Sequence, residues 1–228
     1  MNSISSNKSS NLSGDLVVPG DKSISHRSLI IGSLVNGRIE INNLLESEDV
    51  IATADALQIL GVKINRLNDK WEVFGSGIGN FFGSNYTLNM GNSGTGARLL
   101  MGLVAGSDVE AKFIGDESLS KRPMKRVTAP LKETGAIIKS ETDNLPIIIQ
   151  GSKIPLPIEY QSPISSAQVK SSILLAGLSS LGKTTVIEPT LSRDHTERML
   201  KFFGANITST QLDNMSWKIT LEGVPDLK

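Results

Sequence analysis

Three stretches of the chain share one order of small polar, apolar and glycine residues, and this order recurs about every 70 residues. Each stretch begins with small polar or glycine residues and continues as an apolar run that closes at Leu29–Gly32, Leu99–Gly102 or Leu174–Gly177. A helix that is apolar on nearly every side is typically buried, and a glycine often follows the last helical residue. The pattern therefore predicts three buried helices, each ending at its glycine.

A second set of patterns follows each predicted buried helix. A short alternating or β-branched segment predicts a strand, and a more charged segment at helical spacing then runs to another glycine. A further β-type segment closes each repeat. The expected strands are Arg38–Asn42, Val109–Ile114 and Thr184–Glu188. The second helices are expected to end at Leu60–Gly61, Thr134–Gly135 and Phe203–Gly204. The closing strands are expected at Trp71–Phe74, Leu145–Ile149 and Trp217–Leu221.

The repeats predict an α/β domain of three β-α-β-α-β-β units around shared buried helices, because one unit has too little apolar surface to fold alone. We place the units at about residues 14–84, 85–153 and 154–228. The Ser- and Asn-rich residues 1–13 are expected to form a disordered polar tail. A plastid transit peptide is the alternative, but such peptides are longer and richer in arginine.

Composition narrows the chemistry. The 228 residues include no cysteine and two histidines, which argues against disulfides, thiolate chemistry and a His-rich metal site. The 23 basic and 23 acidic side chains balance, so no overall field attracts nucleic acid or a membrane surface. No apolar run approaches the roughly 18 residues of a spanning helix. We expect a cytoplasmic protein, in which any anion chemistry comes from local placement of charge.

The starts of the three predicted buried helices are candidate anion sites. Small residues there leave backbone N–H groups open, and a helix N-terminus favours phosphate or carboxylate. The alternative is that these residues are only helix caps, which stabilise a helix by about 1 kcal/mol each. Recurring cations beside the starts favour a small, multiply anionic ligand. The three starts and the cations are Asp21–Arg27, Gly91–Gly96 and Ser165–Gln168, with Lys22, Arg27, Lys121, Arg122 and Arg193.

One string matches a nucleotide-binding motif by letter. Gly177–Thr184 has the Walker A pattern, which would indicate a P-loop that binds ATP. A P-loop leaves a strand and enters a helix, whereas this string leaves a predicted helix and enters a predicted strand. We therefore reject the P-loop interpretation.

Three further polar residues have no clear partner in the sequence. We assign His26 and His195 to structural or supporting roles rather than to acid–base chemistry. Arg98 falls inside the second predicted buried helix, where an arginine must be paired or must face a ligand.

Several motifs together resemble the 3-phosphoshikimate 1-carboxyvinyltransferase (EPSP synthase) family from about residue 13 to the end of the chain. They are Pro19–Arg27, Gly91–Arg98, Gly115–Pro123, Ser165–Gln168 and Arg193–Thr196. The resemblance implies a fold of two domains, each with three β-α-β-α-β-β units, that close on substrates between them. Family members are about twice as long as this chain, so the second domain is expected to be absent.

The resemblance also implies a role for each matching residue. Shikimate 3-phosphate is expected at Lys22, Ser23, Arg27, Ser166, Ala167, Gln168 and Arg193. Phosphoenolpyruvate is expected at Lys22, Asn92, Gly94, Arg122 and Gln168. Lys22 is the best local candidate for helping proton transfer, and no metal or organic cofactor is implied.

In the implied reaction, the 5-hydroxyl of shikimate 3-phosphate adds to C2 of phosphoenolpyruvate while C3 is protonated, and the tetrahedral intermediate then expels phosphate. The main acid and base belong to the missing half, so the chain alone is expected to bind weakly and turn over little or not at all. A complete enzyme is expected to be monomeric and, with Gly94, sensitive to glyphosate.

Two other functions compete with this one. A UDP-N-acetylglucosamine enolpyruvyl transferase is the nearest rival, but it usually carries a loop cysteine that this chain lacks. A non-catalytic anion-binding module is the alternative from another class, and binding of shikimate 3-phosphate separates it from the enzyme.

Overall fold

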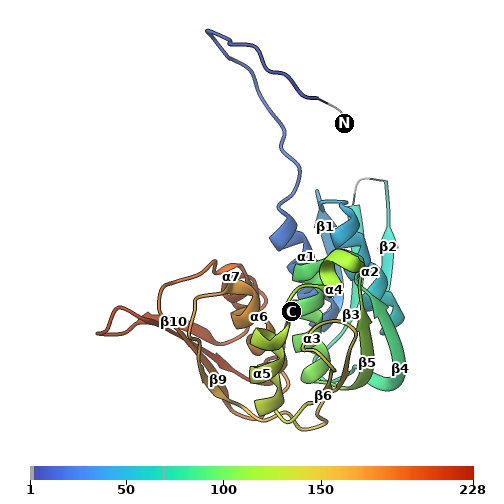
Figure 1. Ribbon diagram of the computed structural model, residues 1–228, viewed down its shortest axis with the longest axis vertical. Coiled ribbons are helices and arrows are strands. Elements are labelled where there is room, and N and C mark those ends of the chain that lie inside the picture. The colour runs from blue at the N-terminus through green and yellow to red at the C-terminus, as the bar shows by residue number, and fades with distance from the viewer. Residues whose placement is uncertain (1–2, 69) are drawn as a thin grey trace.

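A computed structural model describes residues 3–68 and 70–228. In chain order the elements are α1 Lys22–Leu34, β1 Asn36–Asn42, α2 Glu48–Ile59, β2 Lys63–Arg66, β3 Lys70–Ser76, β4 Phe82–Asn89, α3 Gly94–Ala105, β5 Asp108–Ile114, α4 Glu117–Ser120, α5 Lys125–Glu133, β6 Ile137–Lys139, β7 Ile147–Gln150, β8 Glu159–Gln161, α6 Ala167–Gly177, β9 Lys183–Glu188, α7 His195–Phe202, β10 Ile207–Gln211 and β11 Trp217–Glu222 (Figure 1). In these residues no helix is both long and apolar enough to cross a bilayer.

The strands form three separate sheets that share one plan. The strand orders are β1-β3-β2, β4-β5-β7-β6 and β10-β11-β9-β8. In the second and third sheets, the strand before the buried helix pairs in parallel with the strand after it, and every other pairing is antiparallel. This common plan agrees with the α/β fold of repeated units predicted from the sequence.

The first sheet departs from the predicted β-α-β-α-β-β order. It contains β1, β3 and β2, and no strand precedes α1 among residues 3–21. Residues 3–20 form neither helix nor strand and extend away from the body of the molecule (Figure 1). Leu16 and Val17 are exposed there, so the apolar residues of this segment do not contribute to a sheet. The expected first strand is therefore wrong for this unit.

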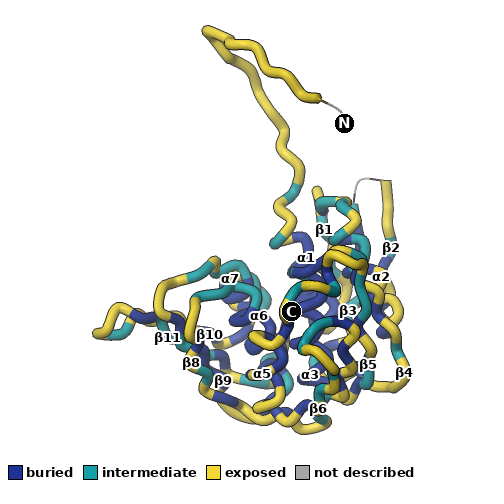
Figure 2. Tube along the Cα trace, viewed as in Figure 1, coloured by how far each residue is buried: buried dark blue, intermediate teal, exposed yellow. Residues whose placement is uncertain are grey.

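The core contains the three helices that the sequence predicted to be buried. Most residues of α1 and α6 and all but one of α3 are buried, and the tube in Figure 2 is mostly dark along these helices. The sheets cover these helices with one face, as in β5, where Val109, Ala111 and Phe113 point inward and Lys112 points outward. Burial on both helix and sheet faces is the main source of stability in such a layered fold.

Two of the predicted helix ends are wrong. Gly32 and Gly102 lie inside α1 and α3, and only Gly177 ends its helix. The reason at Gly102 is helix packing, because a Cβ there would overlap the backbone carbonyl of Ser172 on α6. This glycine allows α3 and α6 to approach closely at the centre of the core.

The glycines after the second helices are confirmed as helix terminators. Gly61, Gly135 and Gly204 follow the C-caps of α2, α5 and α7, with φ values of +95°, +94° and +97°. Only glycine adopts this left-handed conformation without steric cost, so each one turns the chain from a helix into the next strand. The string at Gly177–Thr184 leaves α6 and enters β9, which confirms that it is not a P-loop.

Candidate functional site

The first helix start joins the first and third units. Asp21 caps α1 by accepting from the N–H of Ile24 at 2.8 Å. Ser23 lies one residue into the helix, and its hydroxyl is 3.3 Å from Nη1 of Arg193, which lies in the loop before α7. The polar start of α1 therefore faces the third unit and not only solvent.

The second and third helix starts meet through one glutamine. Ser93 caps α3 and Ser166 caps α6, each by accepting a backbone N–H two or three residues into its helix. Gln168 on α6 donates through Nε2 to the hydroxyl of Thr95 on α3 at 3.0 Å. Arg98 on α3 donates to Oε1 of the same glutamine at 3.2 Å, which fixes both ends of the amide.

These three starts surround one small cavity of about 40 Å³. It is lined by Ser23, Arg27, Thr95, Ala167, Gln168, Arg193 and His195. Five of the predicted site residues therefore lie together, contributed by α1, α6 and the loop before α7. Thr95 and His195 complete the lining and were not predicted to contact a ligand.

Arg27 is the best-anchored cation of the cavity. It is 3% exposed and donates through Nε to Thr196 at 2.6 Å, through Nη2 to Ser171 at 2.8 Å and through Nη1 to the carbonyl of Ser23 at 2.9 Å. Burial lowers its pKa to about 10, with Glu197 opposing that change and Arg193 adding to it. Arg27 stays charged at neutral pH and ties α1 to α6 and α7.

A second polar group lies beside the start of α3. Arg122 donates to Oδ1 of Asn92, and Nδ2 of Asn92 donates to Asp116 at 2.7 Å. Asp116 also caps α4, and its pKa is lowered mainly by the N–H of Leu119. Arg122 lines an open depression with residues 116–118, 121 and 123, so it does not line the cavity of Arg27 and Arg193.

Gly94 links the two parts of the site. Arg98 donates to the Gly94 carbonyl at 3.0 Å, and a Cβ added at Gly94 would lie 2.9 Å from both Arg98 Nη1 and Arg122 Nη1. The bare glycine thus leaves room for two guanidinium groups. Arg98 is 4% exposed, and burial lowers its pKa to about 10. The sequence predicted that such an arginine is paired or faces a ligand. Its partners are backbone carbonyls and the side chain of Gln168.

Lys22 lies outside the cavity. Its Nζ is 2.9 Å from Oδ2 of Asp49 on α2, and about half of its side chain is exposed. The ammonium group of this first α1 residue is therefore paired with α2 and does not line the cavity. Ser166 acts as the α6 cap, adjacent to the lining residue Ala167.

The two histidines occupy different environments. His26 is fully buried, with Nδ1 2.8 Å from the hydroxyl of Thr53, and burial lowers its pKa to about 4. It is therefore neutral at pH 7 and belongs to the core between α1 and α2. His195 is the first residue of α7 and lines the cavity, whereas the sequence predicted a structural or supporting role for it.

Sequence reasoning also missed a buried ionic cluster behind the cavity. Lys170 on α6 lies 2.8 Å from Glu188 at the end of β9 and 2.7 Å from Glu197 on α7. All three residues are buried. The only sequence signal was a lysine within an apolar helix, because its partners are distant in the chain.

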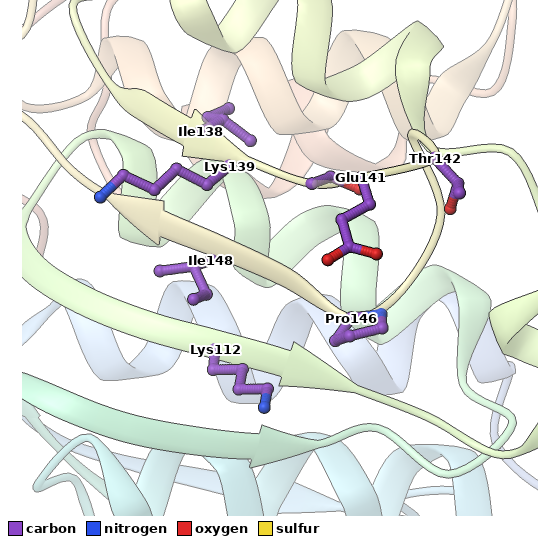
Figure 3. Close-up of a pocket in the computed structure, with 8 residues that line it drawn as sticks. Lys112, Ile138, Lys139, Glu141, Thr142, Pro146 and Ile148 are labelled. Atoms are coloured by element: carbon purple, nitrogen blue, oxygen red, sulfur yellow. The ribbon is translucent and has the colours of Figure 1, made fainter.

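Another surface hollow lies away from the helix starts. Figure 3 shows a pocket of about 600 Å³ on the outer face of the second sheet, where Lys112 of β5, Ile138 of β6 and Ile148 of β7 meet the loop after β6. It contains no predicted site residue and no helix start. The described part of the chain also lacks any group of three or more acidic or histidine side chains that could hold a metal ion. The converging helix starts remain the candidate site.

The fold matches that of solved EPSP synthases. A structure titled EPSP synthase from Acinetobacter baumannii superimposes with a TM-score of 0.86 at 42% identity, covering 94% of this chain and 48% of that one. The described fold therefore corresponds to one domain of a two-domain enolpyruvyl transferase fold.

Sequence comparison identifies the family. The family model described as EPSP synthase (3-phosphoshikimate 1-carboxyvinyltransferase) matches residues 6–228. Proteins named 3-phosphoshikimate 1-carboxyvinyltransferase are 53% identical over 224 residues in Rhodopseudomonas palustris strain BisA53 and 52% identical over 219 residues in Bradyrhizobium diazoefficiens. The matches cover 97% and 95% of this chain and 50% and 47% of those relatives.

This chain belongs to the EPSP synthase family. It spans about half the length of the curated relatives that it matches and of the solved structure.

Proposed function

We propose that a complete enzyme containing this chain transfers the enolpyruvyl group of phosphoenolpyruvate to the 5-hydroxyl of shikimate 3-phosphate, releasing phosphate, as a step of aromatic amino acid biosynthesis. Family membership supports the reaction class. The observation that carries the proposal is that the starts of α1, α3 and α6, with Arg27 and Arg193, surround one cavity. Helix N-termini and arginines together favour a phosphorylated ligand.

We assign shikimate 3-phosphate to the cavity side of the site. Arg27 and Arg193 supply positive charge, Ser23 and Ser166 supply hydroxyls, and Gln168 presents an amide. Ala167 contributes backbone at the start of α6, where the first N–H groups have no acceptor within the helix. Because the two arginines lie on different elements, they can bind one phosphate group from two directions.

We assign phosphoenolpyruvate to the polar group beside the start of α3, next to the cavity. Arg122 and Asn92 form one polar group there, Gly94 keeps the backbone accessible, and Gln168 reaches from the first side to the second. Lys22 is the first residue of α1 and can approach either ligand once it leaves Asp49. Placing two anions together costs Coulomb repulsion, which these cations offset.

The reaction involves three proton transfers. The 5-hydroxyl loses its proton as its oxygen bonds to C2 of phosphoenolpyruvate, and C3 gains one; in the second step C3 loses a proton as the C2–phosphate bond breaks. Lys22 is our candidate for helping one of these transfers. The other acid and base groups are assigned to the half of the family fold that this chain does not include, so the chain alone is expected to bind substrate weakly and turn over little.

Calorimetry of the purified chain with shikimate 3-phosphate tests the assignment. The assignment is supported if the chain binds shikimate 3-phosphate, if Arg193→Ala weakens this binding, and if UDP-N-acetylglucosamine does not compete with it. A chain that ignores shikimate 3-phosphate would instead be a different anion-binding module. Adding the second half of a relative as a separate polypeptide is expected to raise turnover, whereas rapid turnover by the chain alone would contradict the proposed division of roles.

We further propose that the complete enzyme is a monomer in the cytoplasm and is inhibited by glyphosate. The inhibitor proposal rests on Gly94, which leaves the space beside Arg122 open. The balanced charge of the chain gives no reason to expect nucleic acid or membrane partners.

A further inference from the structure

The buried ionic cluster of Lys170, Glu188 and Glu197 joins three elements directly behind the candidate site. Lys170 lies on α6 two residues after Gln168, Glu188 ends β9, and Glu197 lies in the first turn of α7. The side chains of Lys170 and Glu188 are each 1% exposed. The connection between β9 and α7, residues 189–194, passes over this cluster and carries Arg193.

One residue of that connection is held by both members of the ion pair. Glu188 accepts from the backbone N–H of Ser192 at 2.9 Å and from its hydroxyl at 2.7 Å. Lys170 donates to the backbone carbonyl of Ser192 at 3.4 Å. The backbone donor, the backbone acceptor and the side chain of Ser192 are therefore all bound to buried charged groups.

Arg193 follows Ser192 directly. Its side chain is largely exposed, and the contact that the structure shows for its guanidinium is the 3.3 Å one to the hydroxyl of Ser23. An exposed arginine gains little order from one such bond. Its backbone, in contrast, is fixed by the neighbouring residue.

Burying this ionic cluster has a high desolvation free energy and is an inefficient way to stabilise a fold. Removing a lysine and two carboxylates from water costs several kcal/mol per ion, and apolar residues of similar size often stabilise a protein as well or better. Charged partners are useful where a backbone segment needs strong, directional hydrogen bonds, because bonds to ionised groups are shorter and stronger than neutral ones. The connection at residues 189–194 is such a segment.

We propose that Lys170 and Glu188, braced by Glu197, are positioning residues that clamp Ser192 and thereby hold Arg193 at the cavity for a phosphate-bearing ligand. They do not touch the ligand and act through Arg193. This inference rests on the proposed function for the identity of the ligand, but the clamp itself is a property of the unliganded chain.

The test uses this chain with Glu188→Ala as the main variant. Glu188→Gln is the conservative variant, since its amide keeps an acceptor for the Ser192 N–H and a donor for its hydroxyl. Glu72→Ala is the matched control, because Glu72 is also a buried glutamate with a basic partner, Arg38 at 3.1 Å, but lies on β3 of the first sheet. Thermal unfolding first establishes that each variant is folded.

Amide hydrogen exchange measures the clamp without ligand. We expect the Ser192 amide to exchange about tenfold faster or more in Glu188→Ala, to return to within about threefold of the original rate in Glu188→Gln, and to be unchanged in Glu72→Ala. Equal exchange of Ser192 in all four proteins overturns the clamp.

Calorimetry with shikimate 3-phosphate measures the consequence. Glu188→Ala and Arg193→Ala are each expected to weaken binding about tenfold, and the double variant is expected to be no weaker than Arg193→Ala alone, because both changes remove the same contact. Fully additive losses would overturn the route through Arg193. If the unmodified chain does not bind shikimate 3-phosphate, the proposed function fails at this step, and the exchange experiment still decides the clamp.

Discussion

The two ends of the candidate site are built in different ways. At the Arg27 end, the cation is buried and its three nitrogen atoms bond to groups on α1, α6 and α7. At the Arg122 end, the cation is half-buried and bonds to exposed side chains on the loop before α3 and on α4. The first end is part of the core, whereas the second is a surface network.

The chain spans about half the length of the curated relatives that it matches, and the difference between the two ends agrees with this. A site end that is complete within one half is held by that half's own core. The Arg122 network faces an open depression and has few buried contacts to fix it. We infer that the Arg27 end is preorganised in this chain, while the Arg122 end depends on further contacts for its final geometry.

Alanine substitutions at the two arginines test this contrast most strongly. Arg27→Ala leaves a cavity and removes the partner of Ser171, Thr196 and the Ser23 carbonyl, so we expect it to lower the free energy of unfolding by about 2–4 kcal/mol. Arg122→Ala removes an exposed network and is expected to cost about 0.5 kcal/mol or less. Urea unfolding at pH 7 measures both values, and similar losses for the two variants would contradict the contrast.

Local patterns in the sequence were sufficient for much of the fold. The buried helices were predicted because their apolar residues cover all sides, and Gly61, Gly135 and Gly204 were recognised because left-handed helix ends require glycine. Gly102 was misassigned because a glycine that allows α3 to approach Ser172 has the same local pattern as a helix end. Which role a glycine has is decided by the neighbouring helix.

The site was predictable to a similar extent. Polar helix starts and nearby cations are local signals, and they identified Ser23, Arg27, Gln168 and Arg193. The Lys170 cluster was not predictable, since Glu188 and Glu197 come from other elements and each looks like an ordinary surface carboxylate in the sequence. Only the folded arrangement shows that they share one ammonium group.

A pH measurement sharpens the contrast at the buried end. The pKa of His26 is about 4 in the folded chain against 6.5 ordinarily, so between these values the unfolded chain binds more protons and stability falls as pH falls. Asp49, Lys22 and Arg27 are the charged groups that face this histidine. From pH 7 to pH 5 we expect His26 to account for a loss of about 2 kcal/mol.

The control for this effect is His26→Gln, which cannot gain a proton in that range. Urea unfolding of both proteins at pH 7 and pH 5 gives two losses, and the one for the unsubstituted chain is expected to be the larger by that amount. Equal losses would mean that His26 is not held neutral by burial, and the Arg27 end would then be less enclosed than its contacts indicate.

Gly94→Ala examines the boundary between the two ends, and its effect is expected to be smaller than the losses of stability predicted for Arg27→Ala and for protonation of His26. The added methyl would lie 2.9 Å from Nη1 of Arg122 and of Arg98, so these side chains must shift, whereas Arg27 and Arg193 line a separate cavity. In a complete enzyme that includes this chain, we expect the inhibition constant for glyphosate to rise about tenfold, equivalent to about 1.4 kcal/mol, while the KM for shikimate 3-phosphate changes less than about threefold. Inhibition kinetics of the two complete enzymes measure both quantities. An unchanged inhibition constant would refute the steric argument. Arg98 also bonds to Gln168 at 3.2 Å, which connects the two ends. An equal rise in the inhibition constant and in the KM would therefore show that the two ends respond as one unit.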